Sequence, residues 1–95
     1  MSVHIQFNNI RNSNAVEEHV NEQFKDLLKI TDSKFPFHVN MSKVDEIHEV
    51  QIHCSFHHKP LASAAKHENL YKALSKSVDA MRSQVIKRSE KLRQP

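Results

Sequence analysis

The hydrophobic pattern divides the chain into two kinds of segment, one with a two-residue period and one with a helical period. Apolar and polar residues alternate in Val3–Phe7, in Phe37–Ser42 and most clearly in Val50–His57, and a two-residue period is typical of half-buried strands. A fourth, shorter alternation of small residues covers Leu61–Ala65, and we expect another element to approach it closely. The intervening His57-His58-Lys59-Pro60 indicates a hairpin connection, although such connections usually contain glycine.

Two other segments have helical spacing. Apolar residues recur every three or four positions between about Asn14 and Lys29, which predicts an amphipathic helix with Ser13 as its N-cap. Asn69 is the predicted N-cap of a longer helix that extends almost to the C-terminus. The apolar seam predicted for this last helix consists of Tyr71, Leu74, Val78, Met81, Val85 and Leu92.

The order of these segments is β-α-β-β-β-α, which predicts one α+β domain over residues 1–95. The helix between strands one and two requires a crossover, so we expect these strands to be parallel. Strands two to four have short links and are expected to form an antiparallel meander. The prediction is a four-stranded mixed sheet with two helices packed on one face. The other face should be open to solvent and carry His38, Asn40, Gln51, His53 and Ser55.

Composition excludes several classes of function. The 95-residue chain contains no glycine, so it lacks the glycine-dependent phosphate loops of nucleotide-binding enzymes. Its one cysteine, Cys54, falls on the apolar side of its strand, so we expect a buried, inert thiol. No signal-peptide pattern or membrane-length apolar run is present, which predicts a soluble cytoplasmic protein without membrane association.

Positive charge is concentrated in the last helix. Residues 1–65 contain six Lys or Arg and eight Asp or Glu, whereas residues 66–95 contain eight Lys or Arg and only three Asp or Glu. Such a local excess favours a phosphate backbone or an acidic protein surface as partner. The alternative is a solvated helix face that keeps the protein soluble.

The turn before the last helix carries the most specific motif, Ala65-Lys66-His67-Glu68-Asn69-Leu70-Tyr71 followed by Ala73. Weaker matches are the opening Ile5-Gln6-Phe7-Asn8-Asn9 and the first-helix residues Ala15, Val20, Phe24 and Leu27. With these motifs the whole chain resembles the bacterial hibernation-promoting factor and ribosome-associated inhibitor family. The resemblance implies a fold like a double-stranded-RNA-binding domain, which agrees with the element order derived above.

The resemblance also implies a target, which charge alone does not supply. Members bind the small ribosomal subunit and its rRNA in the decoding region, block messenger and transfer RNA, and inhibit translation in stationary phase or stress. This chain resembles the short form, which lacks the C-terminal dimerisation domain. A separate ribosome modulation factor is the partner through which such short factors give paired ribosomes.

The candidate RNA contacts are the positively charged side chains and one histidine of the last element. They are Lys66, His67, Lys72, Lys76, Arg82, Lys87, Arg88 and Lys91. Two alternatives stay open: a module for other structured RNA, and a protein-interaction domain with an acidic partner. The sequence gives no constellation for an enzyme, a metal site, a cofactor or a small-molecule substrate. We expect Tyr71 to pack in the core, where it starts the apolar seam, and His67 to support the turn.

Overall fold

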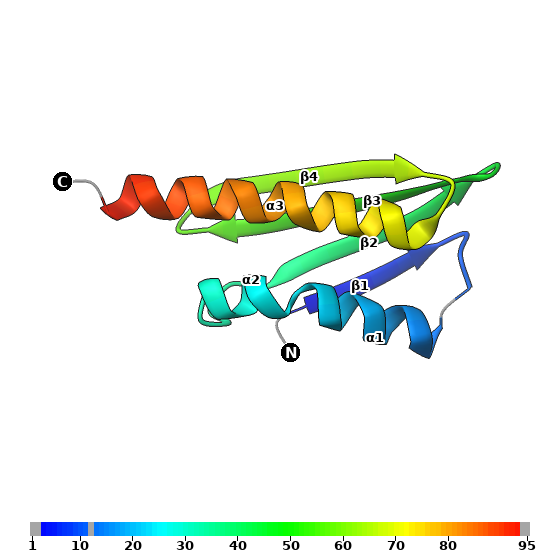
Figure 1. Cartoon of the computed structure of the whole chain (residues 1–95), viewed down its shortest axis with the longest axis horizontal. Helices are drawn as coiled ribbons and strands as arrows, with labels where there is room; N and C mark the ends of the chain where they lie inside the picture. Colours follow the sequence, from blue (N-terminus) through cyan, green and yellow to red (C-terminus); the bar gives the residue numbers. More distant parts are fainter. Residues whose placement is uncertain (1–2, 12, 94–95) are drawn as a thin grey trace.

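The computed structural model describes residues 3–11 and 13–93. It is an elongated molecule of 48 × 22 × 18 Å in which a long helix lies along a twisted sheet (Figure 1). The elements in chain order are β1 (Val3–Asn8), α1 (Asn14–Gln23), α2 (Lys25–Ile30), β2 (Phe37–Val44), β3 (Ile47–Phe56), β4 (Lys59–His67) and α3 (Leu70–Arg93). None of the helices in the described ranges is both long and apolar enough to cross a membrane.

The four strands form one mixed sheet in the order β1-β2-β3-β4. β1 and β2 are parallel, with Ile5 opposite Val39, whereas β2, β3 and β4 are antiparallel neighbours. Both predicted pairings are therefore confirmed. The strands are longer than the sequence pattern indicated, because β3 begins at Ile47 and β4 extends to His67.

The helices cover one face of this sheet, with α3 over β3 and β4 and the α1–α2 segment beside it (Figure 1). The prediction of one helix from Asn14 to Lys29 is wrong in one respect, because α1 ends at Gln23 and α2 begins at Lys25. Phe24 between them has φ −89° and ψ −2°, so the backbone bends there. The apolar seam continues through the bend, since Phe24 is fully buried against Phe37 with ring centroids 5.3 Å apart.

The core lies between the sheet and the helices, as the alternation predicts. Val39, Met41 and Ile52 are almost fully buried, while His38 and His53 on the opposite sheet face are exposed. In the last helix the predicted seam is buried from Leu74 to Val85. The seam prediction is wrong at Tyr71 and at Leu92, which are 43% and 47% exposed. The last turns of α3 extend past the strands (Figure 1), so the sheet does not bury Leu92.

The small side chains of β4 let α3 approach closely, as expected. Ser63 Oγ donates a hydrogen bond to the Ser77 carbonyl oxygen at 2.8 Å, and Ser77 Oγ donates to the Leu74 carbonyl oxygen at 2.9 Å. All these groups are buried, so each hydroxyl has the partner that burial demands. Gln84 Nε2 donates to the Ala62 carbonyl oxygen at 2.6 Å and ties α3 to the same strand further along.

The β3–β4 hairpin turns without glycine. Its loop consists of His57 and His58, with φ of 50° and 66°, whereas Lys59 and Pro60 already belong to β4. Two residues with positive φ are the requirement of a type I′ turn, in which glycine and asparagine are preferred. The fold therefore places two histidines in a backbone region that disfavours side chains with a Cβ atom.

Candidate nucleic-acid interface

The start of α3 is fixed by hydrogen bonds from the motif residues. Asn69 Oδ1 accepts from the backbone N–H groups of Tyr71 at 2.9 Å and Lys72 at 3.2 Å, which confirms Asn69 as the N-cap. The Asn69 N–H donates to His67 Nδ1 at 2.9 Å, so His67 supports the turn. His48 Nδ1 donates to the Glu68 carbonyl oxygen at 2.8 Å, which joins β3 to the turn. The motif thus orients the helix that carries seven of the 14 Lys and Arg residues of the chain.

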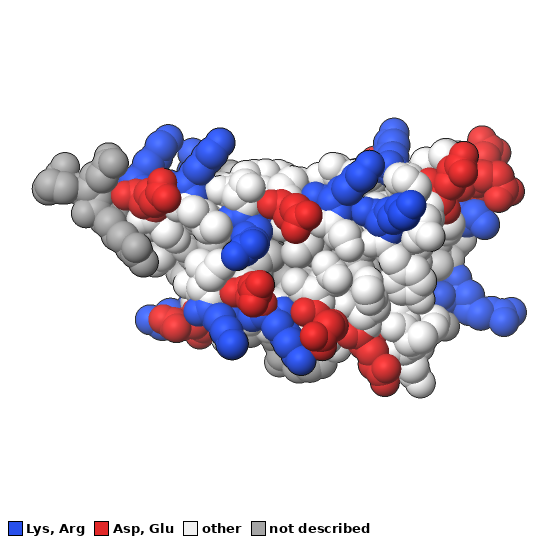
Figure 2. All heavy atoms as spheres, in the orientation of Figure 1, with Lys and Arg blue, Asp and Glu red and all other residues white. Residues whose placement is uncertain are grey.

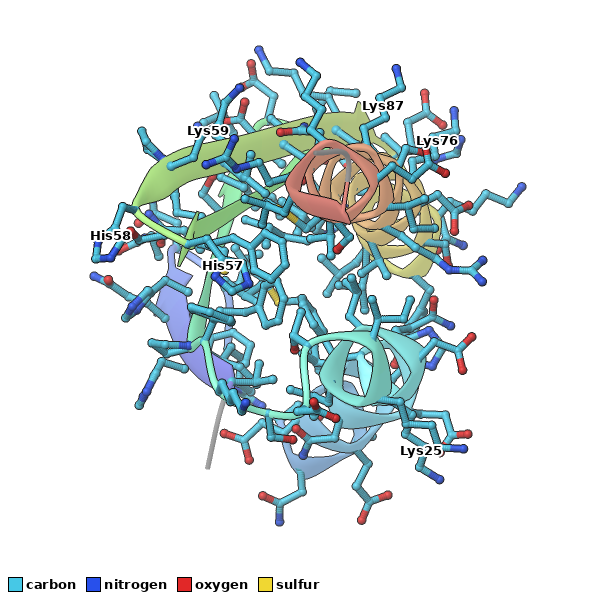
Figure 3. All side chains as sticks on the ribbon, turned by 90° about the vertical axis from the view of Figure 1, so that its left-hand side faces the viewer. Lys25, His57, His58, Lys59, Lys76 and Lys87 are labelled. Carbon is cyan, nitrogen blue, oxygen red and sulfur yellow. The ribbon has the colours of Figure 1, made fainter. Side chains whose placement is uncertain are left out.

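The outer surface of α3 carries a row of exposed lysines. Lys72, Lys76, Lys87 and Lys91 are all exposed, and helical spacing places them on one side of the helix. Figure 2 shows positive side chains gathered along the upper edge of the molecule over α3, interrupted by acidic groups. Lys76 and Lys87 point away from the sheet (Figure 3). We call these four side chains the α3 lysine row.

At the C-terminal half of α3 the lysine row meets the start of β4. Lys59 and Pro60 from β4 and Lys87, Arg88 and Lys91 from α3 line a hollow of about 220 Å³. Figure 3 shows Lys59 on the same upper side of the molecule as Lys87. The linear sequence does not indicate Lys59 as a site residue, because it precedes the basic segment and lies in the predicted hairpin connection. The two-residue loop is what brings it beside the helix.

Arg88 differs from the lysines because it is half-buried. Its Nη2 donates to the His57 carbonyl oxygen at 3.4 Å, so the guanidinium contacts the hairpin loop. Its Nε atom is buried and has no hydrogen-bond partner among the residues that the structure describes. Arg88 therefore supports the loop in addition to lining the hollow beside Lys87.

Two other predicted contacts lie away from the lysine row. Lys66 is on β4, where its Nζ is 3.9 Å from Glu49 Oε2 of the neighbouring strand. The pair lies on the sheet face opposite the helices, and at this exposure it contributes little to stability. Arg82 is exposed two turns after Ser75, whose Oγ donates to Gln23 Oε1 of α1 at 3.4 Å. Arg82 thus lies on the flank of α3 that faces α1.

The α1–α2 side has mixed charge. Lys25 Nζ pairs with Glu22 Oε2 at 2.9 Å, and Figure 2 shows both signs interspersed along the lower edge of the molecule. The N-terminal half of the chain therefore offers no continuous positive surface on this view. The positive field is local to α3 and the start of β4, as the charge asymmetry of the sequence indicates.

The only cysteine is unsuited to chemistry at this surface. Cys54 is 3% exposed, and burial raises the pKa of its thiol above the ordinary value. A neutral thiol is a poor nucleophile. Among the described residues, no group of three or more His, Cys, Asp or Glu side chains is arranged to hold a metal ion. The arrangement suits binding of a polyanion.

A family model described as "Sigma 54 modulation protein / S30EA ribosomal protein" matches residues 3–93. The chain belongs to this family. Membership indicates a ribosome-associated protein, and it agrees with the resemblance carried by the motif before α3. No curated protein matches the chain significantly in sequence.

Solved structures of the same fold include two bacterial proteins. One is the N-terminal domain of Protein Y from Thermus thermophilus, with 19% sequence identity and a TM-score of 0.78, covering 87% of this chain and 91% of that chain. The other is a ribosomal subunit interface protein from Coxiella burnetii, with 12% identity and a TM-score of 0.83, covering 95% of this chain and 99% of that chain. At these identities the likeness establishes the fold, and the predicted α+β architecture of the family is confirmed.

Proposed function

We propose that this protein binds the small ribosomal subunit in the decoding region and inhibits translation by occupying the space of messenger and transfer RNA. Membership of a family of ribosome-associated proteins supports this target. The Coxiella burnetii protein of the same fold is described as a ribosomal subunit interface protein, which also favours a site between the subunits. On this proposal the protein works in the cytoplasm, in stationary phase or under stress.

The α3 lysine row, with Lys59 beside it, is the observation that carries the proposal. Lysine ammonium groups bind phosphates as point charges, and such contacts give affinity and position without reading base sequence. The row is preformed on a helix whose start is capped by Asn69 and whose inner face is tied to β4 by Gln84. Binding therefore costs little ordering of the backbone.

The proposed mechanism is steric and includes no chemical step. A rigid domain 48 Å long that lies on rRNA excludes other RNA from the same space. Its affinity comes largely from counterion release, so it falls as salt rises. The protein acts by residence on the ribosome, and it dissociates unchanged. Pairing of ribosomes through a separate modulation factor would be a later step on the complex formed here.

Co-sedimentation with purified small subunits over a salt series tests the proposal. The double variant Lys72→Glu with Lys76→Glu should bind more weakly. For each phosphate that the variant no longer binds, the slope of log affinity against log salt should decrease by about 0.7–0.9. The matched control is Lys25→Glu with Lys29→Glu, which makes the same charge change at the same spacing on α2, and it should bind more tightly than the α3 variant.

Three outcomes would contradict the proposal. Absence of co-sedimentation at every salt concentration would exclude the small subunit as the target. An equal decrease in affinity in the α2 and α3 variants would remove the lysine row as the contact surface. Displacement from subunits by an equal concentration of unrelated duplex RNA would instead indicate a general module for structured RNA.

A further inference from the structure

Tyr71 is an aromatic residue of the motif that begins α3, and its side chain lies at the protein surface. It begins the seam that the sequence predicts, yet it is 43% exposed. Its ring meets His19 of α1 edge-on, with ring centroids 4.6 Å apart and planes at 86°. The two rings form a corner, and the exposed part of Tyr71 is open to a partner. An exposed aromatic ring offers a π-face on which a flat ligand can stack.

The corner belongs to a hollow of about 420 Å³ between α1 and the first turns of α3. His19 and Tyr71 line it together with Asn69, Lys72, Ser75 and Lys76. The hollow is shallow and open to solvent, so it suits a group that lies against the surface rather than one that is enclosed. Ser75 Oγ donates to Gln23 Oε1 at 3.4 Å, so a hydrogen bond spans the two helices next to the hollow and holds them in position.

Two lysine side chains, Lys72 and Lys76, lie beside this aromatic corner. In the described part of the chain the ion pairs are Lys25 with Glu22 and Lys66 with Glu49, so neither Lys72 nor Lys76 is held in an ion pair. They are four residues apart and therefore lie on the same side of the helix. An aromatic face next to two ammonium groups complements a nucleotide, which has a π-surface and a phosphate.

We propose that the corner of Tyr71 and His19 binds an unpaired RNA base, which stacks on Tyr71 while Lys72 and Lys76 bind the flanking phosphates. This inference rests on the proposed RNA-binding function and assigns one subsite within it. The base must be unpaired, because a base within a duplex has both faces covered by its neighbours. Stacking tolerates any base identity, so the subsite selects local RNA structure and not sequence.

A second hollow, lined by several positive side chains, provides an internal contrast. Lys59, Lys87, Arg88 and Lys91 surround it, and no aromatic side chain is among its lining residues. Its chemistry suits phosphate alone. The two ends of α3 are therefore expected to differ: the N-terminal end depends on the presence of a base, and the C-terminal end depends on charge only.

The composition of the chain supplies a direct reporter for the test. Tyr71 is the only tyrosine and there is no tryptophan, so the intrinsic fluorescence of the intact protein comes from the proposed site. Titration of the wild-type protein with a short single-stranded oligouridylate should quench this emission. An abasic ribose-phosphate chain of the same length should bind without quenching it. Free tyrosine amide in the same titration corrects for absorption by the RNA.

Variants distinguish the contribution of the base to binding affinity from that of the phosphates. Tyr71→Leu retains apolar volume but removes the π-face, and it should weaken oligouridylate binding about tenfold, in the range measured for single base–aromatic stacks. Its affinity for the abasic chain should not change, and Tyr71→Phe should retain wild-type affinity for both. Lys87→Glu should weaken both ligands by the same factor. Circular dichroism checks that each variant is folded.

The possible results distinguish this inference from the proposed function. Oligouridylate that binds without altering Tyr71 emission overturns the base subsite, as does a Tyr71→Leu variant with wild-type affinity. Co-sedimentation of that variant with small subunits at wild-type affinity would overturn the subsite and leave the proposed function intact. Failure of the wild-type protein to co-sediment would instead overturn the proposed function, and the subsite with it.

Discussion

The glycine-free loop of the β3–β4 hairpin allows a quantitative prediction about stability. His58 is exposed and has φ 66°, next to His57 with φ 50°. For a residue with a Cβ atom the left-handed conformation costs about 1–2 kcal/mol. Glycine avoids this cost but loses about 0.5–1 kcal/mol through its larger conformational entropy in the unfolded chain. His58→Gly should therefore stabilise the protein by about 0.5–1 kcal/mol.

Urea denaturation followed by far-ultraviolet circular dichroism measures this gain, and thermal denaturation should show a rise in Tm of about 2–8 °C for a domain of this size. The matched control is His58→Ala, which also removes the imidazole but keeps the Cβ atom and hence the strain. It should remain within about 0.5 kcal/mol of the wild type. His57 is unsuitable for the same substitution, because its ring contacts Phe35 and Phe56 and its carbonyl oxygen accepts from Arg88.

The comparison of the two variants decides whether the reasoning is correct. If His58→Gly were no more stable than His58→Ala, backbone strain would not be stored at this loop. An unchanged slope of unfolding free energy against urea is also required, since a changed slope would indicate an effect on the unfolded state. The ring contacts of His57 are the same in both variants, so they do not affect the comparison.

Two further predictions concern the helix start and the buried thiol. Asn69→Ala removes the acceptor of the Tyr71 and Lys72 N–H groups, and it should lower the free energy of unfolding in urea by about 1 kcal/mol. Asn69→Asp should retain the cap and most of the stability. Equal destabilisation by the two variants would refute the capping role of the Asn69 side chain. Burial raises the pKa of the Cys54 thiol above its ordinary value, so at alkaline pH the folded state retains a proton that the unfolded state releases. Stability should therefore fall as pH rises through and above this value, and Cys54→Ala should show a smaller fall in the same assay; equal falls would contradict the assignment.

Much of the fold followed from local patterns. The alternation in β2 and β3 identified which residues are buried, and the spacing from Leu74 to Val85 identified the inner side of α3. These inferences succeed because side-chain direction within one element is fixed by backbone geometry. The break at Phe24 was not predictable in the same way, because the apolar seam continues through it without glycine or proline.

The candidate site was predictable in charge but not in shape. The excess of Lys and Arg after residue 65 located the lysine row on α3, and no position in the linear sequence pointed to Lys59 as its neighbour. Lys66 belongs to the same basic segment, yet it lies on the opposite sheet face beside Glu49. At the strand-to-helix turn, residues that are close in sequence therefore lie on different faces of the molecule.

The order of strands and helices apart from the break at Phe24, the buried side of the strands and of α3 from Leu74 to Val85, and the cap at Asn69 all followed from the sequence alone, as did the placement of the lysine row on α3. These properties depend on neighbours a few residues away. Tertiary packing, in contrast, makes Tyr71 a surface residue that faces His19 and places Lys59 beside Lys87. Helical spacing gives the direction in which a side chain leaves its helix. Whether it then meets the core, another helix or water depends on how far the neighbouring elements extend.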